Sequence, residues 1–247
     1  MIDNDTSTGT GGFGEILVSS RSLGEYRAMF ALTDDDLGRR ILDCPGGAAG
    51  FTAEVSQRGG DVTACDIAYF DKGVDRVAAT AVAEADRGNR YVREHADAYR
   101  WTFFADPADH HRARRESAEQ FAAHTRSSPR RYVPGRLPAL PFVDNSFDLV
   151  LSSHLLFSYA DDLDYEFHRQ AITELARVAT TEVRLFPVVP IGSPGRYEQL
   201  EKLLAELSLA GISSRIMKVD YEFQAHADEM LVCEVAAQAS GGRSAAV

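Results

Sequence analysis

The apolar positions of the chain predict strands and helices in alternation. Three short, nearly continuous apolar runs, at residues 40–44, 61–67 and 147–152, are typical of strands buried on both faces of a parallel sheet. Elsewhere apolar residues recur at helical spacing, as at Tyr26 and Phe30 ahead of the first strand. The other predicted strands are 131–133, 182–189, 213–223 and 230–235, and the predicted helices are 51–59, 74–85, 164–178, 197–209 and one within 22–37 that ends at a turn over 33–36. This alternation favours an α/β fold.

The alternating region has polar ends and one long interruption. Residues 1–14 and 239–247 lack hydrophobic periodicity, so we expect them to be flexible ends of a single domain over 15–238. Residues 89–130 stay helical in character and combine aromatic side chains with many charges. We expect this stretch to be a helical cap inserted into the domain.

Charge and cysteine content limit the binding partners and the cellular compartment that we expect for this protein. With 37 acidic and 26 basic residues, the net charge of −11 repels nucleic acids and anionic membrane surfaces. Cys44, Cys65 and Cys233 lie far apart and are expected to be buried thiols in a reducing compartment. No apolar run approaches the ~20 residues of a membrane span, and the polar start shows no signal peptide. We expect a cytoplasmic protein with a small-molecule substrate and no bound metal, whose oligomeric state stays open.

A glycine turn between two aspartates is the first candidate site. The first predicted strand ends at Asp43 and leads into Pro45, Gly46 and Gly47, and the second strand ends at Asp66. Glycine lets the backbone approach a ligand, and a helix start offers free N–H groups, so a strand, turn and helix make a general nucleotide cradle. A carboxylate at the end of the second strand is placed to accept ribose hydroxyls. We therefore expect a nucleoside to bind at these strand ends.

The same turn departs from the dinucleotide pattern. The pattern G-x-G-x-x-G requires a first glycine where this chain has Pro45, which has a fixed φ and no N–H. Pyrophosphate beside Asp43 would be repelled, whereas the sulfonium and ammonium of S-adenosylmethionine (SAM) are attracted to carboxylates. The electrostatics favour SAM over NAD as the cofactor.

Two blocks of sequence resemble class I SAM-dependent methyltransferases. The first is DCPGGAAG at 43–50, followed by CD at 65–66, and the second is LPFVDNSFDLVLSSHLLF at 140–157. The segment ELARVATTEVRLFP also resembles the fourth helix and fifth strand of that family. The resemblance covers about 42–189 and implies a Rossmann-like sheet of seven mostly parallel strands with helices on both faces.

The first block departs from the family motif D-x-G-x-G-x-G. Asp43 and Gly47 match it, whereas Pro45 and Ala49 stand where the family has glycine. We expect the displaced glycines to serve the cofactor in a shifted turn; these are Gly46 and Gly50.

The strand ends and the resemblance together define the candidate site. His154 follows the fourth strand and is the candidate catalytic base, because an imidazole titrates near neutral pH; a structural histidine is the alternative. Aromatic side chains beside a sulfonium contribute cation–π attraction, with core packing as the alternative. The expected substrate contacts are Phe30, Phe157 and Tyr159. The expected cofactor-binding residues are Tyr26, Asp43, Pro45, Gly46, Gly47, Asp66, Ile67 and Ser153.

Two features of the cap are expected on solvated surfaces. His110 and His111 are adjacent, so their side chains diverge on a helix, and no third metal ligand is evident. A basic run is typical of a solvated face in an acidic protein, with docking of an anionic substrate or an acidic carrier as the alternative. It comprises the arginines at 112, 114, 115, 126, 130 and 131.

Methyl transfer from SAM to a small molecule is the leading hypothesis. Such an in-line displacement depends mainly on positioning, and it needs a base only where the nucleophile loses a proton. The irregular turn at 45–47 motivates a rival in which SAM donates its aminocarboxypropyl arm or cyclises. The other rivals are a non-catalytic SAM-fold binding protein and a nicotinamide-dependent oxidoreductase. The identity of the acceptor depends on the cap, because one fold serves many reactions.

Overall fold

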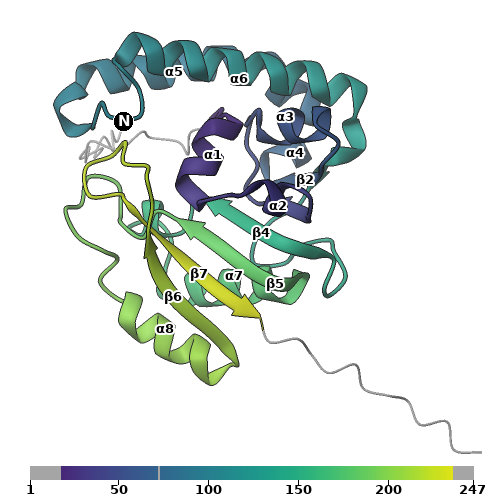
Figure 1. Ribbon diagram of the computed structural model, residues 1–247, viewed down its shortest axis with the longest axis vertical. Helices are drawn as coiled ribbons and strands as arrows, with labels where there is room; N and C mark the ends of the chain where they lie inside the picture. The colour runs from purple at the N-terminus through teal and green to yellow at the C-terminus, as the bar shows by residue number, and fades with distance from the viewer. Residues whose placement is uncertain (1–17, 72, 236–247) are drawn as a thin grey trace, which may run out of the picture.

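Seven strands form one sheet in the computed structural model, which describes residues 18–71 and 73–235. The strand order is β3-β2-β1-β4-β5-β7-β6, and β7 runs antiparallel to both of its neighbours while the other pairs are parallel. The predicted Rossmann-like α/β fold is thereby confirmed (Figure 1). The predicted flexible ends, 1–14 and 239–247, lie outside the described residues. The strands are β1 (Arg40–Asp43), β2 (Asp61–Asp66), β3 (Tyr132–Pro134), β4 (Phe147–Ser153), β5 (Ala179–Phe186), β6 (Ile212–Lys218) and β7 (Glu229–Val235).

The sheet changes its direction of winding at β1. This strand pairs with β2 on one side and with β4 on the other. In open α/β sheets, ligands bind outside the carboxyl ends of the strands at such a switch point. Asp43 lies opposite Ala64 and Leu151, so Asp66 and Ser153 extend two residues beyond the tip of β1. Three strand ends therefore meet at one edge, as the parallel arrangement predicts.

Side chains of the central strands alternate between two core layers. Leu42 and Val150 pack in the layer formed with α7 and α8, whereas Ile41 and Leu149 pack in the layer formed with α1 and α3. Burial on both faces explains why these strands are nearly continuous in apolar residues. The covering helices are α1 (Leu23–Phe30), α3 (Phe51–Gln57), α7 (Tyr165–Val178) and α8 (Leu200–Leu209).

The helix predicted within 22–37 is two short helices. Ser22 begins α1 with a reciprocal capping box, and Ala31 ends it in the left-handed conformation with φ of 48°. Thr33 and Asp36 form a second capping box that begins α2 (Asp34–Leu37). The acidic stretch expected as a turn is helical, because these two side chains satisfy the N–H groups at its start.

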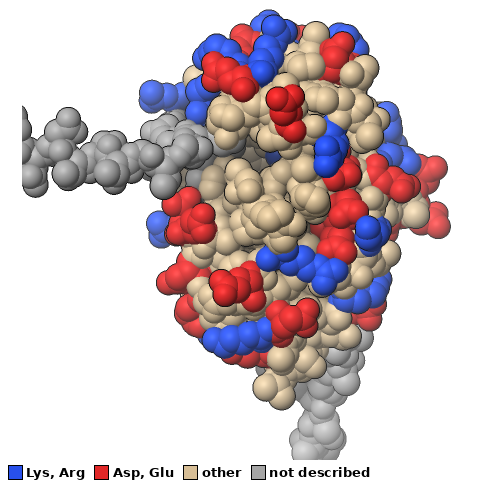
Figure 2. Space-filling model, turned by 90° about the vertical axis from the view of Figure 1, so that its left-hand side faces the viewer, with Lys and Arg blue, Asp and Glu red and all other residues tan. Residues whose placement is uncertain are grey.

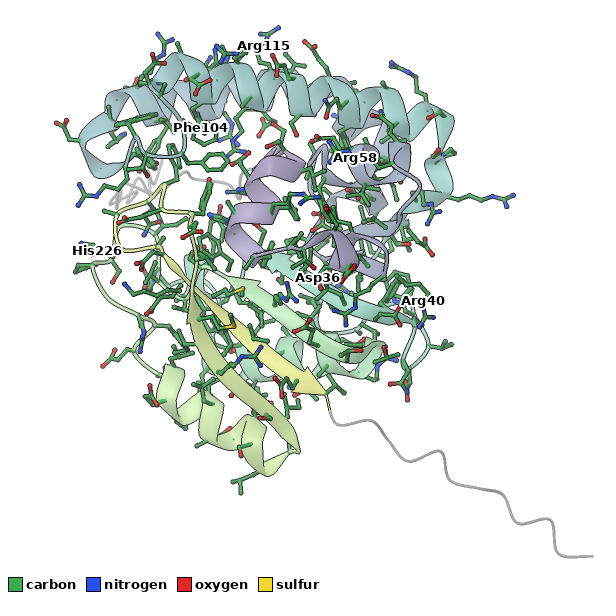
Figure 3. All side chains as sticks on the ribbon, in the orientation of Figure 1. Asp36, Arg40, Arg58, Phe104, Arg115 and His226 are labelled. Carbon is green, nitrogen blue, oxygen red and sulfur yellow. The ribbon has the colours of Figure 1, made fainter. Side chains whose placement is uncertain are left out.

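Two long helices form the cap above the sheet domain. They are α5 (Gly73–Glu94) and α6 (Pro107–Ser127), which lie side by side in Figure 1. The cap begins earlier than the predicted boundary at residue 89. The alanine-rich helix predicted over 74–85 is the first part of α5, which continues without a break past residue 89. Phe104 is buried beneath α6 on the side that faces the sheet, whereas Arg115 points outward (Figure 3). The cap therefore has an apolar inner face.

The remaining differences from the predicted elements are shifts of a few residues. β5 lies about three residues before the predicted 182–189, and it ends where Pro187 removes a backbone donor. Helix α8 begins at Leu200 instead of 197. The short elements are α4 (Ala68–Asp71) and the 3-10 turns η1 (Ala96–Ala98), η2 (Pro129–Arg131) and η3 (Phe157–Tyr159).

Charged residues of both signs are interspersed over the face shown in Figure 2, above and below a central uncharged band. Part of the basic run is paired with acidic residues, which limits its net field. These pairs are Arg112–Asp109, Arg115–Asp86 and Arg131–Asp61.

Candidate functional site

Two adjoining cavities lie at the carboxyl edge of the sheet. The larger cavity has a volume of about 510 Å³ and the smaller cavity a volume of about 120 Å³. They share Val18, Ser19, Arg21 and His154, so they meet just beyond the end of β4. The volume of the larger cavity falls within the roughly 300–1,000 Å³ of small-molecule sites.

Residues that follow three strands line the larger cavity. The turn after β1 and the ends of β2 and β4 all contribute to its wall. This is the position that the topology predicts for a ligand. Most of the residues expected to bind the cofactor lie here, namely Tyr26, Pro45, Gly46, Gly47, Asp66, Ile67 and Ser153.

Asp66 is held in one orientation at the tip of β2. Its Oδ2 accepts the N–H of Gly47 at 2.8 Å, and its Oδ1 accepts the N–H of Ala68 at 2.8 Å. Burial raises the pKa of Asp66, and the two backbone N–H groups act in the opposite direction. A carboxylate has about four acceptor positions, so both oxygens keep capacity for a ligand hydroxyl. Next to it, Ile67 is 57% exposed and offers an apolar surface to a flat ring.

The backbone N–H groups of the glycine turn all have partners within the protein. The acceptors are Cys65 O for Gly46, Asp66 Oδ2 for Gly47, Ser19 O for Ala48, Gly46 O for Ala49, and Arg21 O with Ser117 Oγ for Gly50. A dinucleotide cradle needs such N–H groups free for the pyrophosphate. The turn therefore disfavours a dinucleotide, in agreement with the argument from Pro45.

The displaced glycines are required by contacts within the protein. A Cβ on Gly46 would lie 2.8 Å from the Cβ of Ala64 on β2. A Cβ on Gly50 would lie 2.7 Å from the Oγ of Ser117 on α6. These two glycines let β2 and the cap approach the turn. Gly46 also lines the larger cavity, so its role toward the cofactor stays a prediction, whereas Gly50 lines neither cavity.

Asp43 is buried behind the wall of the larger cavity and lines neither cavity. Its side chain is fully buried, and its two oxygens lie 2.9 and 3.0 Å from the hydroxyl of Tyr26, which donates to them. Burial raises the pKa of Asp43 to about 8; the Tyr26 hydroxyl lowers it, Asp66 raises it and Arg21 lowers it. The two aspartates lie on adjacent strands as expected, but Asp43 reaches the larger cavity only through its hydrogen bond with Tyr26.

His154 lies where the two cavities meet. Its backbone is left-handed, with φ of 50°, and its N–H donates to the carbonyl of Phe186 at 2.7 Å. Its Nδ1 lies 2.8 Å from the Oγ of Ser153. Burial lowers the pKa of His154 well below 6.5, and Arg21 and Arg114 lower it further. The ring is neutral at neutral pH, so the expectation that it titrates near neutrality is corrected by its burial among cations.

The smaller cavity lies between the cap and the loops of the sheet domain. The cap contributes residues of both α5 and α6, and the opposite wall comes from the loops that follow β4, β5 and β6. Its side chains include Ala85, Val92, Tyr99, His110, Arg114, Tyr159, Ile191, Phe223 and Gln224. The cap therefore encloses space directly beside His154.

Two cap residues expected on a solvated surface are buried. His110 is 4% exposed and Arg114 is 7% exposed. Arg114 pairs with the buried Glu25 of α1 at 2.5 Å and donates to the carbonyl of Ser20 at 3.1 Å. Tyr221 donates to the same carboxylate at 3.0 Å. This ionic network joins α6 to α1 and to the segment before β7. The expectation of a solvated face is therefore corrected for His110 and Arg114, whereas Arg112, Arg126 and Arg130 are exposed as expected.

The expected substrate-contacting residues are divided between cavity and core. Tyr159 lines the smaller cavity. Phe30 and Phe157 line neither cavity, because they turn into the core against Phe186 and Tyr197. For these two residues the core-packing alternative holds.

The sequence reasoning missed Arg21, His110 and Arg114. A signal was present for the two cap residues, because the buried positions of α6 recur at helical spacing. They are His110, Arg114, Ser117, Ala118, Phe121, His124 and Thr125. Arg21 precedes α1 and belongs to no such pattern.

Within residues 18–71 and 73–235, no group of three or more His, Cys, Asp or Glu side chains could hold a metal ion. In the same part of the chain, no helix has the length and apolar character needed to cross a membrane. Cys44, Cys65 and Cys233 are free and buried.

Comparisons with known proteins found one matching family model and one relative in sequence. The sequence model of a family described as a methyltransferase domain matches residues 105–186, which run from the start of α6 to the end of β5. An uncharacterized protein of Methanocaldococcus jannaschii is 28% identical over 220 residues, which cover 88% of this chain and 96% of the relative.

Two solved structures are also similar. One is a SAM-dependent methyltransferase from Aquifex aeolicus, at 14% identity and a TM-score of 0.46, with 87% of this chain and 89% of that chain covered. The other is magnesium protoporphyrin IX methyltransferase from Synechocystis with bound SAM, at 16% identity and a TM-score of 0.44, with 87% and 78% covered.

Proposed function

We propose that this chain, a member of the class I SAM-dependent methyltransferase family, binds SAM in the larger cavity and transfers its methyl group to a small molecule in the smaller cavity. The observation that carries the proposal is Asp66, an oriented carboxylate at the tip of the second strand, beside a turn with no N–H group left for phosphate. That combination suits a nucleoside without a pyrophosphate.

The residues of the larger cavity fit SAM in chemistry as well as in size. Asp66 keeps acceptor positions for the ribose hydroxyls, and the exposed side chain of Ile67 offers an apolar surface for the adenine. Tyr26 lines the same wall, and its hydroxyl donates to Asp43 behind it. Buried carboxyl groups favour a cationic ligand over an anionic one. When bound, SAM supplies an electrophilic methyl group on a sulfonium.

The protein's part in the reaction is mainly positioning. The larger and smaller cavities meet at Ser19, Arg21 and His154, which is where donor and acceptor would face each other. Holding a nucleophile in line with the methyl group supplies much of the rate. The cap closes the smaller cavity and limits the access of water to this point.

His154 is the proposed base for an acceptor that must lose a proton. Its ring is neutral, so a nitrogen lone pair is available, and its hydrogen bond with Ser153 holds the imidazole in place. The lowered pKa of His154 makes it a weak base, because burial and the nearby arginines disfavour the imidazolium. A negatively charged acceptor beside those arginines would raise that pKa and strengthen the base.

Calorimetry and product analysis test this proposal. We expect SAM to bind at micromolar concentration and incubation with SAM and a cell extract to yield S-adenosylhomocysteine, the product of methyl transfer. Methylthioadenosine would instead indicate transfer or cyclisation of the aminocarboxypropyl arm. SAM binding without turnover in any extract would indicate a binding protein. The absence of SAM binding would contradict the proposal itself.

A further inference from the structure

We propose that the smaller cavity binds the acceptor as a small planar anion, a one-ring carboxylate, with its negative group against Arg21 and His110. This inference rests on the proposed function, because it assigns the substrate class of the same reaction. Three features of the cavity carry it: two buried donors without partners, an excess of positive charge and an aromatic wall of limited size.

Arg21 brings a guanidinium to the junction of the two cavities without an acidic partner. Across 18–71 and 73–235, no ion pair within 4.0 Å joins it to Asp or Glu. Its Nη1 donates to the Oγ of Ser19, while its buried Nε has no hydrogen-bond partner. A buried donor without a partner is costly, and the planar fork of arginine suits a carboxylate. A ligand anion would complete this site.

His110 contributes a second donor to the same cavity. Its Nε2 accepts a hydrogen bond from the Nε of Arg114 at 3.2 Å. Burial and the charge of Arg114 lower the pKa of His110 to about 2, so the ring is neutral and carries one proton. Because Nε2 is the acceptor, that proton lies on Nδ1, which is buried and has no partner. Arg21 and His110 both line this cavity, and a carboxylate bound there would supply the acceptors that their two N–H groups lack.

The acidic side chains around this cavity already have cationic partners. Glu84 lines the wall and pairs with Arg87 at 2.7 Å, and Glu25 pairs with Arg114 at 2.5 Å. The guanidinium of Arg21 is therefore the excess charge of the cavity. A cation in this place would be repelled, whereas an anion would be attracted in surroundings of low dielectric constant.

The wall restricts the body of the ligand to a single flat ring. Phe223 stacks on Tyr99 with ring centroids 4.5 Å apart, and on His110 with centroids 4.7 Å apart. All three side chains line the cavity. The volume of about 120 Å³ is of the same order as the ~150 Å³ of an apolar cavity that holds benzene. A single ring fills a space of this size.

Arg21 has a second candidate partner, because it also lines the larger cavity. There its guanidinium would pair with the carboxylate of the methionine part of SAM instead of with the acceptor. His110 lines only the smaller cavity. Substituting the two residues separately therefore distinguishes an acceptor site from a cofactor contact.

Titration calorimetry with benzoate and benzamide tests the proposal on the full-length protein saturated with S-adenosylhomocysteine. The two probes share a ring and differ in charge, and we expect benzamide to bind at least ~10-fold more weakly. Arg21→Met and His110→Phe are each expected to weaken benzoate binding ~10- to 100-fold. Arg112→Met removes an exposed arginine from the same cap and is expected to leave the affinity for benzoate unchanged.

Thermal unfolding identifies variants that fail to fold. For Arg21, the variant Arg21→Lys keeps the charge but loses the fork, and a smaller loss of benzoate affinity is expected. Equal affinity for benzoate and benzamide would overturn the proposal and leave the proposed function intact. So would an Arg21→Met variant that loses affinity for S-adenosylhomocysteine but not for benzoate. If the wild-type protein gives no heat with S-adenosylhomocysteine, the proposed function fails, and benzoate titrated alone still tests the cavity.

Discussion

The two cavities that meet at His154 are built in different ways. The wall of the larger cavity comes largely from the few residues that directly follow β1, β2 and β4. The wall of the smaller cavity comes from segments far apart in sequence, including the N-terminal stretch, both cap helices and the loop between β6 and β7. The order of the strands alone places the residues of the larger cavity, whereas the residues of the smaller cavity come together only when the cap packs on the domain. We therefore expect cofactor binding and acceptor recognition to respond to different substitutions.

His154 belongs to both cavities, and its substitution should have the largest effect. His154→Asn is the suitable variant, because asparagine tolerates the left-handed backbone found here. Loss of the base should lower the turnover of a proton-bearing acceptor by about 100-fold or more. SAM affinity should persist, and calorimetry checks it. An unchanged turnover would reduce His154 to a structural residue.

Asp66 tests the larger cavity alone. Asp66→Ala removes the proposed acceptor of the ribose hydroxyls and should weaken SAM binding ~10- to 100-fold. Asp61→Ala, at the opposite end of the same strand, is the matched control and should leave SAM affinity unchanged. Equal SAM affinity in both variants would remove the central contact of the account.

Gly50 tests how the cap is joined to the domain. A Cβ at this position would press on the Oγ and carbonyl of Ser117 in α6, so Gly50→Ala should lower the free energy of unfolding by about 1–3 kcal/mol. Gly24→Ala is the control, since its Cβ would meet only Ser22 Oγ, at 3.7 Å. Chemical denaturation measures both variants. A Gly50→Ala protein as stable as the wild type would show that the cap contact can relax.

The burial of Asp43 should appear as a pH dependence of the stability of the protein. Burial raises the pKa of Asp43 from 3.8 to about 8, so between these values the folded state holds a proton that the unfolded state has released. The free energy of unfolding should therefore fall as pH rises from about 4 to about 8, by at most about 1.4 kcal/mol per pH unit. Asp43→Asn cannot ionise and should lack this contribution. Denaturation of both proteins at several pH values compares the slopes, and identical slopes would refute a raised pKa.

The difference between the two cavities also explains which features of the site could be predicted from the sequence. The strand ends, the glycine turn and Asp66 were predictable, because each is encoded within a few consecutive residues that follow an apolar run. The burial of Asp43 behind Tyr26 was not, because it depends on how α1 lies across β1. Phe30 illustrates the same limit, since helical spacing indicates a buried face but does not say whether that face meets a cavity or the core.

Helical spacing would have distinguished the buried arginine of α6 from the exposed ones. Arg112, Arg114 and Arg115 look alike in the sequence, yet only Arg114 lies on the buried stripe with His110 and Phe121. Its partner Glu25 is 89 residues away in the chain, so no local pattern could indicate the ion pair. His110, which is proposed to bind the acceptor, lies on the same stripe and was indicated by its spacing, whereas Arg21 belongs to no such pattern.

A crystal structure of the complex with S-adenosylhomocysteine tests the central claim most directly. The account predicts the nucleoside in the larger cavity, its ribose hydroxyls on the carboxylate of Asp66 and its sulfur directed toward His154 and the smaller cavity. A nucleoside bound elsewhere on the molecule, or one in that cavity whose ribose makes no contact with Asp66, would contradict it.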